Sequence, residues 1–171
     1  MKPFNVVNLQ KWIEENKDNL KPPVCNKEVL PGSEYIVMVI GGPNNRKDYH
    51  YNETPEFFYQ VKGDMVLKIM DEGTPRDIPI REGEIFVLPA KVPHSPQRTA
   101  GSIGVVIEHV RKPEQHTDGF QWYCESCNNK LHEDYFKLTN IEKQLPETFA
   151  KFNNNSELHR CKSCGEVLQI C

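Results

Sequence analysis

"RKDYHYNETPEFFYQVKGD", residues 46–64, combines residue types that bind metals with a run that resembles a β-strand. His50 and Glu56 stand six positions apart, and aromatic and β-branched residues follow them. Gly63 can adopt the positive φ that tight connections require, so we expect a compact hairpin that joins strands at about 57–62 and 65–70. Taken alone, the stretch also suits a polar surface loop.

Comparable short runs lie on both sides of this stretch. They read "EYIVMVIGG" (34–42), "REGEIFVLPA" (81–90) and "GSIGVVIEHV" (101–110). Glycine, proline and aspartate separate them, which is typical of an all-β region. Ahead of them, apolar residues at helical spacing between 9 and 20 predict one short helix, with Asn8 as its cap and Pro22 and Pro23 after its end.

Composition narrows the class of protein. The chain has 171 residues, 37% of them hydrophobic, and a formal net charge of -3. No run approaches the roughly 20 apolar residues of a membrane span, and the first residues lack the apolar core of a signal peptide. We therefore expect a cytoplasmic protein with no membrane partner. The absence of a run of lysines and arginines argues against nucleic acid as a partner.

Four of the six cysteines form two pairs, Cys124 with Cys127 and Cys161 with Cys164, with 33 residues between the pairs. In a reducing compartment, this spacing predicts a tetrahedral metal site of four thiolates rather than disulfides. Iron and zinc both suit four thiolates. Such a site has no open position for a substrate, so we expect a structural role. We place a boundary near residue 111, with a barrel domain over 1–110 and a C-terminal extension over 111–171. Trp122 and Tyr123 are expected to pack between the two.

Two segments of the β region resemble the paired motifs of the cupin superfamily. The first contains His50, Glu56 and Gly63, with Asn52 where the family has a second histidine. The second contains Gly83, Pro89 and His94, with Lys91 at a usual glycine position. The resemblance implies a mainly β fold, the double-stranded β-helix or jelly-roll barrel, and the metal ligands His50, Glu56 and His94. Two imidazoles and one carboxylate on one face of an octahedral ion leave room for a substrate and dioxygen.

Three charged residues flank these ligands. Arg46 lies four residues before His50, Arg98 lies four residues after His94, and Glu108 falls near the end of a strand. An arginine can grip a carboxylate in two places, and a glutamate can accept a proton from a substrate. Without the metal motif, solvated surface charges would explain the two arginines, and an edge-strand charge that discourages aggregation would explain Glu108.

Five segments together extend the resemblance to nearly the whole chain. They are "RKDYHYNETPEFFYQVKGDMVLKI", "LPAKVPHSPQR", "VIEHVR", "DGFQWYCESC" and "RCKSCG". They are similar to the 3-hydroxyanthranilate 3,4-dioxygenases of the bacterial and fungal type, which carry a cupin barrel and a four-cysteine site.

The resemblance implies Fe(II) on His50, Glu56 and His94, and substrate contacts from Glu56, Arg98 and Glu108. It places Arg46 beside the substrate and oxygen, with Arg46 and Glu108 in catalytic roles. At the four cysteines it implies a second, rubredoxin-like iron, with zinc as the alternative. The implied reaction is the ring cleavage of 3-hydroxyanthranilate by O2 to 2-amino-3-carboxymuconate semialdehyde, the precursor of quinolinate and NAD. Exposed strand edges favour a homodimer.

Two other hypotheses fit parts of the sequence. One keeps the iron and changes the substrate to another small acidic aromatic or to a thiol. The other is not enzymatic: the cysteines would form a zinc ribbon for interaction, and the barrel would act as a sensor.

Overall fold

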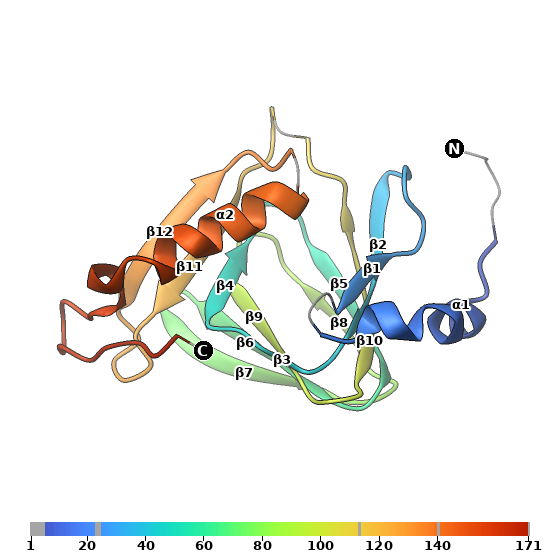
Figure 1. Cartoon of the computed structure of the whole chain (residues 1–171), viewed down its shortest axis with the longest axis horizontal. Helices are drawn as coiled ribbons and strands as arrows, with labels where there is room; N and C mark the ends of the chain where they lie inside the picture. Colours follow the sequence, from blue (N-terminus) through green and yellow to red (C-terminus); the bar gives the residue numbers. More distant parts are fainter. Residues whose placement is uncertain (1–5, 23–24, 113, 140, 171) are drawn as a thin grey trace.

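The computed structural model describes residues 6–22, 25–112, 114–139 and 141–170, without the side chains of residues 141–143 and 146. Two antiparallel sheets face each other and form the body of the molecule (Figure 1). The first sheet has the order β1 (Asn26–Glu28), β2 (Tyr35–Gly41), β10 (Ile103–His109), β5 (Glu56–Lys62) and β8 (Ile85–Leu88). The second has the order β12 (Lys130–Phe136), β11 (Asp118–Tyr123), β4 (Asp48–Tyr51), β9 (His94–Arg98), β6 (Met65–Asp71) and β7 (Thr74–Ile80), with β3 (Asn44–Asn45) paired to β9. The mainly β jelly-roll expectation is confirmed.

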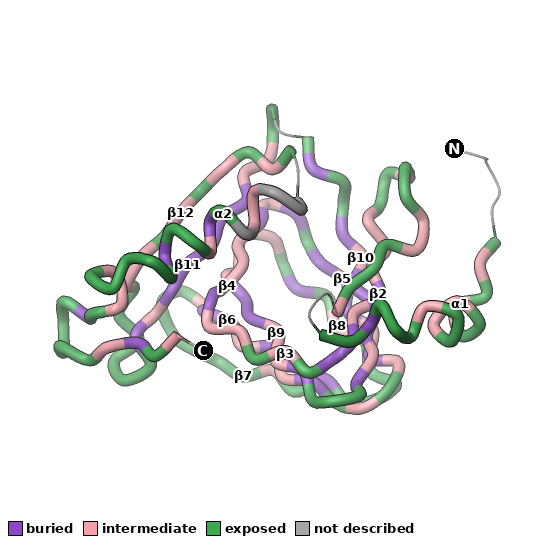
Figure 2. The backbone as a smooth tube through the Cα atoms, in the orientation of Figure 1, coloured by how far each residue is buried: buried purple, intermediate pink, exposed green. Residues whose placement is uncertain are grey.

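The main hydrophobic core lies between the two sheets. Phe58 and Val106 contribute to it from the first sheet, and Leu67 and Ile80 from the second. Along β5, buried and half-buried residues alternate, as expected for a strand with one face toward a core. Buried residues run along β5, β10 and β11, whereas β7 at the sheet edge is largely exposed (Figure 2).

The prediction of a hairpin around Gly63 is wrong, although both strands exist at 56–62 and 65–71. β5 pairs with β8 and β10, and β6 pairs with β7 and β9, so the turn carries the chain from one sheet to the other. Gly63 does have a positive φ of 63°. The crossing is favourable because Phe58 and Leu67 can then face each other across the core, where each buries its side chain completely or nearly so.

The predicted N-terminal helix is confirmed as α1 (Leu9–Asn16), which continues into the 3-10 helix η1 (Lys17–Leu20). The side chain of Asn8 accepts a hydrogen bond from the backbone N–H of Lys11 at 3.0 Å, which caps the first turn. Pro22 follows the helix in a turn, and Pro23 lies outside the described residues. The helix packs on the outer face of the first sheet, against apolar residues of β2 and β10.

The C-terminal segment is part of the second sheet. β11 pairs with β4 and with β12, so this sheet runs across the predicted boundary near residue 111. The helix α2 (Ile141–Asn153) packs against the paired strands β11 and β12, and the 3-10 helix η2 (Ser156–His159) follows it (Figure 1). Phe152 is fully buried and stacks on Trp122, with ring centroids 4.3 Å apart. The packing role of Trp122 is confirmed, whereas two separate folding units remain a prediction. Among the described residues, no helix is long and apolar enough to cross a membrane.

Candidate metal centre

The three predicted metal ligands converge from both sheets. His50 on β4 stands directly opposite His94 on the paired strand β9, and Glu56 begins β5 of the facing sheet. Glu56 Oε1 lies 3.5 Å from His50 Nδ1 and 3.3 Å from His94 Nε2. One ligand atom from each of the three residues lies within 4.8 Å of the other two. Two imidazoles and a carboxylate therefore point at one small volume.

Neighbouring charges shift the pKa values of two of the three ligands, His50 and Glu56. Burial opposes a charge on His50, but the carboxylates of Asp118 and Glu56 outweigh burial and raise the pKa of His50 to about 9. Burial likewise opposes a charge on Glu56, yet His94 and His50 hold the pKa of Glu56 well below its ordinary value. Glu56 is thus ionised and ready to accept a cation.

Asn52 takes a specific part in this arrangement. It is buried, with 3% of its surface exposed, and its amide group donates a hydrogen bond to Glu56 Oε1. Its carbonyl oxygen accepts the backbone N–H of Thr54 at 2.9 Å. Asn52 therefore orients a ligand from the position where the superfamily has a further histidine. Lys91, at the usual glycine position, has a φ of 69°, so the turn keeps the left-handed conformation that glycine adopts most easily.

Arg98 is buried in the same barrel. Only 2% of its surface is exposed, and Nη1 donates to Gln60 Oε1 at 3.1 Å. Nε and Nη2 have no hydrogen-bond partner within the described part of the chain. Burial lowers the pKa of Arg98 to about 10, which still leaves the guanidinium charged at neutral pH. Two buried donors without acceptors are suited to a carboxylate.

Glu108 stands opposite Glu56 on the neighbouring strand β10. Its Oε2 lies 2.6 Å from Arg111 Nη2 in an ion pair that lacks the alignment of a hydrogen bond. Burial, together with the charge of Glu56, raises the pKa of Glu108 above its ordinary value, and Arg111 opposes this effect. A carboxylate of this kind accepts a proton more readily than an exposed one.

Arg46 contacts other groups than the three ligands. Its Nε donates to both oxygens of Asp48, at 3.2 and 3.0 Å, and its guanidinium lies 5.7 Å from the Phe120 ring and 5.9 Å from the Phe149 ring. Asp48 and His50 lie two positions apart on β4 and so point to the same side of that strand, and Arg46 precedes the strand. The predicted role of Arg46 at oxygen stays a prediction.

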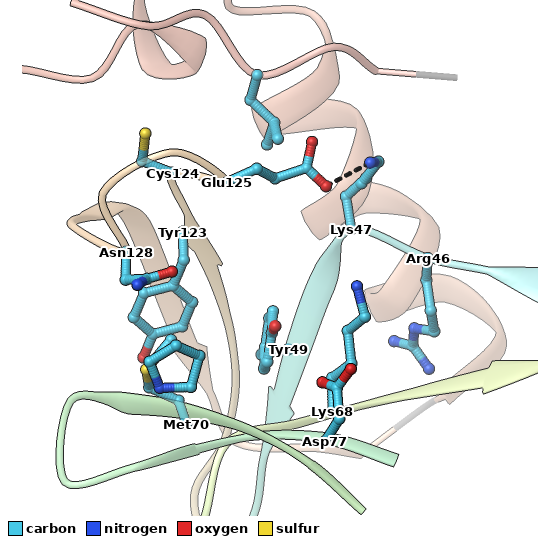
Figure 3. Close-up of a pocket in the computed structure, with 12 residues that line it drawn as sticks. Arg46, Lys47, Tyr49, Lys68, Met70, Asp77, Tyr123, Cys124, Glu125 and Asn128 are labelled. Carbon is cyan, nitrogen blue, oxygen red and sulfur yellow. Dashed lines mark hydrogen bonds and ion pairs between the residues drawn. The ribbon is translucent and has the colours of Figure 1, made fainter. Parts of the chain in front are cut away.

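Arg46 and Cys124 also border a separate pocket of about 170 Å³ (Figure 3). Tyr49, Lys68 and Tyr123 line it, and none of the three metal ligands does. This pocket is therefore distinct from the metal centre.

The four cysteines form a second cluster. Cys124 Sγ lies 3.6 Å from Cys164 Sγ, and Cys127 Sγ lies 3.5 Å from Cys161 Sγ. All four sulfur atoms lie within 4.8 Å of one another. Backbone N–H groups, led by that of Cys164, lower the pKa of Cys161 to about 6, whereas contacts with Cys127 and Cys124 outweigh the backbone N–H of Glu166 and raise the pKa of Cys164.

The two cysteine pairs are built alike. The N–H of Asn128 donates to the carbonyl of Cys124, and the N–H of Gly165 donates to the carbonyl of Cys161, both at 2.9 Å. Asn128 and Gly165 both have positive φ values, so each turn curls its backbone around its two sulfurs.

Three residues of the centre escaped the sequence analysis: Gln60, Arg111 and Asp118. Asp118 accepts a hydrogen bond from His50 at 3.0 Å and two from Arg111 Nε, at 3.0 and 3.1 Å. The spacing of Arg111, three residues after Glu108, was the only local signal. The position of Asp118 depends on the pairing of β11 with β4, which the sequence motifs do not report.

The donor sets fit metals of different kinds. Two imidazoles and a carboxylate, with further positions open, suit ferrous iron, and four thiolates suit tetrahedral iron or zinc. Two facing antiparallel sheets that hold such a trio between them define a metal-dependent protein of the cupin class.

The comparisons identify the family within this class. The family model for 3-hydroxyanthranilic acid dioxygenase matches residues 1–153, and the chain belongs to that family. The 3-hydroxyanthranilate 3,4-dioxygenase of Xanthomonas euvesicatoria is 56% identical over 161 residues, 94% of this chain and 90% of that protein. The protein of the same name from Bacillus thuringiensis is 45% identical over 168 residues, 98% of this chain and 93% of that protein. A crystal structure of a cupin-2 domain containing protein from Shewanella frigidimarina has a TM-score of 0.49 and 17% identity, over 62% of this chain and 95% of that one.

Proposed function

We propose that the protein cleaves the ring of 3-hydroxyanthranilate with O2 and forms 2-amino-3-carboxymuconate semialdehyde, the precursor of quinolinate and NAD. Membership of the family supports the reaction class. The observation that carries the choice of substrate is Arg98, because two of its buried donors lie in the same barrel as the three ligands and have no partner among the described residues.

The charges of the centre also favour a substrate with one carboxylate. Two buried arginines, Arg98 and Arg111, stand against three buried carboxylates, Glu56, Glu108 and Asp118. This set carries one net negative charge with neutral histidines. A divalent cation changes it to one net positive charge, which a substrate monoanion neutralises. A buried charge without a compensating charge costs free energy, so the carboxylate of a substrate would stabilise the metal-loaded centre.

Each residue then has a defined task. His50, Glu56 and His94 would hold Fe(II), which would supply the open coordination positions and the electronic help that dioxygen chemistry needs. Arg98 orients the substrate through its carboxylate.

The remaining polar residues act on the substrate or on oxygen. Glu108 takes the proton of the ring hydroxyl and so makes the ring electron-rich. Glu56 contacts the substrate from the ligand side. Arg46, held by Asp48, acts on the oxygen side.

At the four cysteines we propose a rubredoxin-like iron, with zinc as the alternative, in a structural role. A cytoplasmic location would keep these thiols reduced. With a formal net charge of -3, the chain is not expected to use nucleic acid or a membrane as a partner.

We further propose a homodimer through the outer face of the first sheet. Ile85 and Val87 on the edge strand β8 are 64% and 57% exposed, and Tyr35 nearby is 49% exposed. An apolar edge strand that stays uncovered tends to associate, and a two-fold axis would cover both copies. Light scattering of Val87→Lys should report a monomer, while Val6→Lys, at another exposed valine, should leave a dimer. A wild-type monomer at micromolar concentration would refute this interface.

A single assay tests the function. The protein is loaded with Fe(II) without oxygen, mixed with 3-hydroxyanthranilate and exposed to oxygen, and product absorbance and oxygen uptake are followed together. Catechol and cysteine serve as competitors that represent an uncharged aromatic and a thiol substrate. We expect stoichiometric uptake with 3-hydroxyanthranilate alone, and Arg98→Met should raise KM by at least about 100-fold because a charge-assisted pair is lost. Folded, iron-loaded protein without turnover would exclude the proposal.

A further inference from the structure

A buried chain of charges lies behind the metal centre. Arg111 Nε donates to Asp118 at 3.0 and 3.1 Å, Nη1 donates to the carbonyl of His109 at 2.9 Å, and Nη2 lies 2.6 Å from Glu108. Asp118 in turn faces His50 at 3.0 Å. Side-chain exposure is 5% for Arg111 and 1% for Asp118, so water cannot replace these contacts. Every nitrogen of the guanidinium therefore has a partner, in contrast to Arg98.

Arg111 links the two sheets through this buried chain of charges. Glu108 is near the end of β10 in the first sheet, and Asp118 begins β11 in the second. Arg111 lies where the chain leaves one sheet for the other, and it holds one carboxylate from each. The proposed base and the carboxylate behind a metal ligand are thus fixed to one rigid, planar group.

Asp118 transmits this constraint to the metal ligand. Arg111 holds Asp118 as a carboxylate, which accepts a hydrogen bond from the Nε2–H of His50. Nδ1 of His50 is directed at Glu56, 3.5 Å away, which is the side on which a metal would bind. A carboxylate behind a ligating histidine fixes the tautomer and orientation of the ring, and its loss commonly costs 10- to 100-fold in metal affinity or activity.

We infer that Arg111 is a positioning residue that sets the metal ligand His50, through Asp118, and the base Glu108 in one fixed relation. This inference deepens the proposed function and rests on it for the role of Glu108. The role of Arg111 in metal binding rests only on the contacts from Arg111 to Asp118 and from Asp118 to His50. A lysine at 111 would keep the charge but could not reach three acceptors in one plane, so shape as well as charge is required.

The experiment compares Arg111→Met and Arg111→Lys with Arg76→Met, which removes an exposed arginine of β7 that pairs with Asp71 of β6. Mn(II) serves as the probe because it prefers imidazole and carboxylate to thiolate, and its binding is followed by electron paramagnetic resonance. Anaerobic binding of 3-hydroxyanthranilate and steady-state kinetics are measured on the iron-loaded proteins.

We expect Arg111→Met to weaken Mn(II) binding 10- to 100-fold and to lower kcat by at least as much, while KM changes less than about threefold because Arg98 still holds the substrate. Arg111→Lys should recover part of the Mn(II) affinity and little of kcat. Arg76→Met should match the wild type. Folded Arg111→Met with wild-type Mn(II) affinity and kcat would overturn the inference.

If Arg111→Met does not fold, Asp118→Asn keeps the shape of the side chain and removes its charge. It should weaken Mn(II) binding by the same 10- to 100-fold, and unchanged binding would again overturn the inference. If the wild-type protein binds Mn(II) as expected but does not turn over 3-hydroxyanthranilate, the proposed function fails. The Mn(II) affinities of the Arg111 variants still decide whether Arg111 positions the metal ligand.

Discussion

His50 is the residue at which the electrostatics of the metal-free protein can be measured. The carboxylates of Asp118 and Glu56 raise its pKa from 6.5 to about 9 despite burial. A histidine with a raised folded-state pKa stabilises the fold fully below pH 6.5, and this contribution is lost as the pH rises through about 9. The shift corresponds to at most about 3 kcal/mol.

We predict that removal of the catalytic metal leaves a protein whose stability, relative to His50→Gln, is higher at pH 6 than at pH 10. The difference in the free energy of unfolding between the two proteins should shrink by up to about 3 kcal/mol over this range. Denaturant unfolding at several pH values measures it. A difference that does not vary with pH would show that Asp118 and Glu56 do not hold a proton on His50.

Some single residues of the site could be predicted from the sequence, and others could not. The resemblance to the paired cupin motifs predicts His50, Glu56 and His94, because such motifs keep few residue types at fixed intervals, and the three residues do cluster. Asn52 was interpreted as a missing ligand, and the structure adds that it holds Glu56. Asp118 could not be found, because its contact with His50 spans 68 positions and depends on strand pairing.

At the scale of elements, the sequence predicted strands better than their partners. Apolar alternation located β5 and β6, but it could not distinguish a hairpin from a crossing between sheets. β7 and β9 were missed because prolines interrupt both. Edge position explains the prolines of β7, since an edge strand leaves N–H groups free. Pro96 of β9 is tolerated for a related reason, because β9 pairs with β4 only at His94.

The seating of α2 gives a prediction for an element. Phe152 is fully buried and stacks on Trp122 with an angle of 11° between the rings. Phe152→Ala should lower the free energy of unfolding by about 3 to 5 kcal/mol, because a cavity forms between α2 and the second sheet. Denaturant titration measures the loss.

Phe152→Leu is the matched control, with an expected cost under about 1.5 kcal/mol because it keeps most of the volume. Mn(II) affinity at the catalytic centre should stay within about twofold of wild type in both variants. A stability loss in the alanine variant no larger than in the leucine variant would mean that the helix is not held by this stack.

At the scale of the whole molecule, the second sheet contributes to both candidate metal sites. β4 carries His50, and its neighbour β11 runs from Asp118 to the residue before Cys124. The division near residue 111 stays a prediction, and the second sheet continues across that point. Membership of the family extends across that point, since the family model matches residues 1–153.

The last prediction separates the two metals by what each supports. His94→Ala removes a ligand that is 2% exposed and should abolish turnover, whereas Cys161→Ser should leave kcat within about twofold once folded protein and catalytic iron are matched. Because four thiolates leave no position for a substrate, the loss of Cys161 should appear as stability. A loss of about 2 to 3 kcal/mol would lower Tm by roughly 5 to 10 °C in a chain of this length. Calorimetry and turnover on the same samples measure both effects.

Equal loss of intrinsic turnover in the two variants would show that the four-cysteine metal takes part in the reaction. An unchanged Tm for Cys161→Ser would show that this metal does not support the fold.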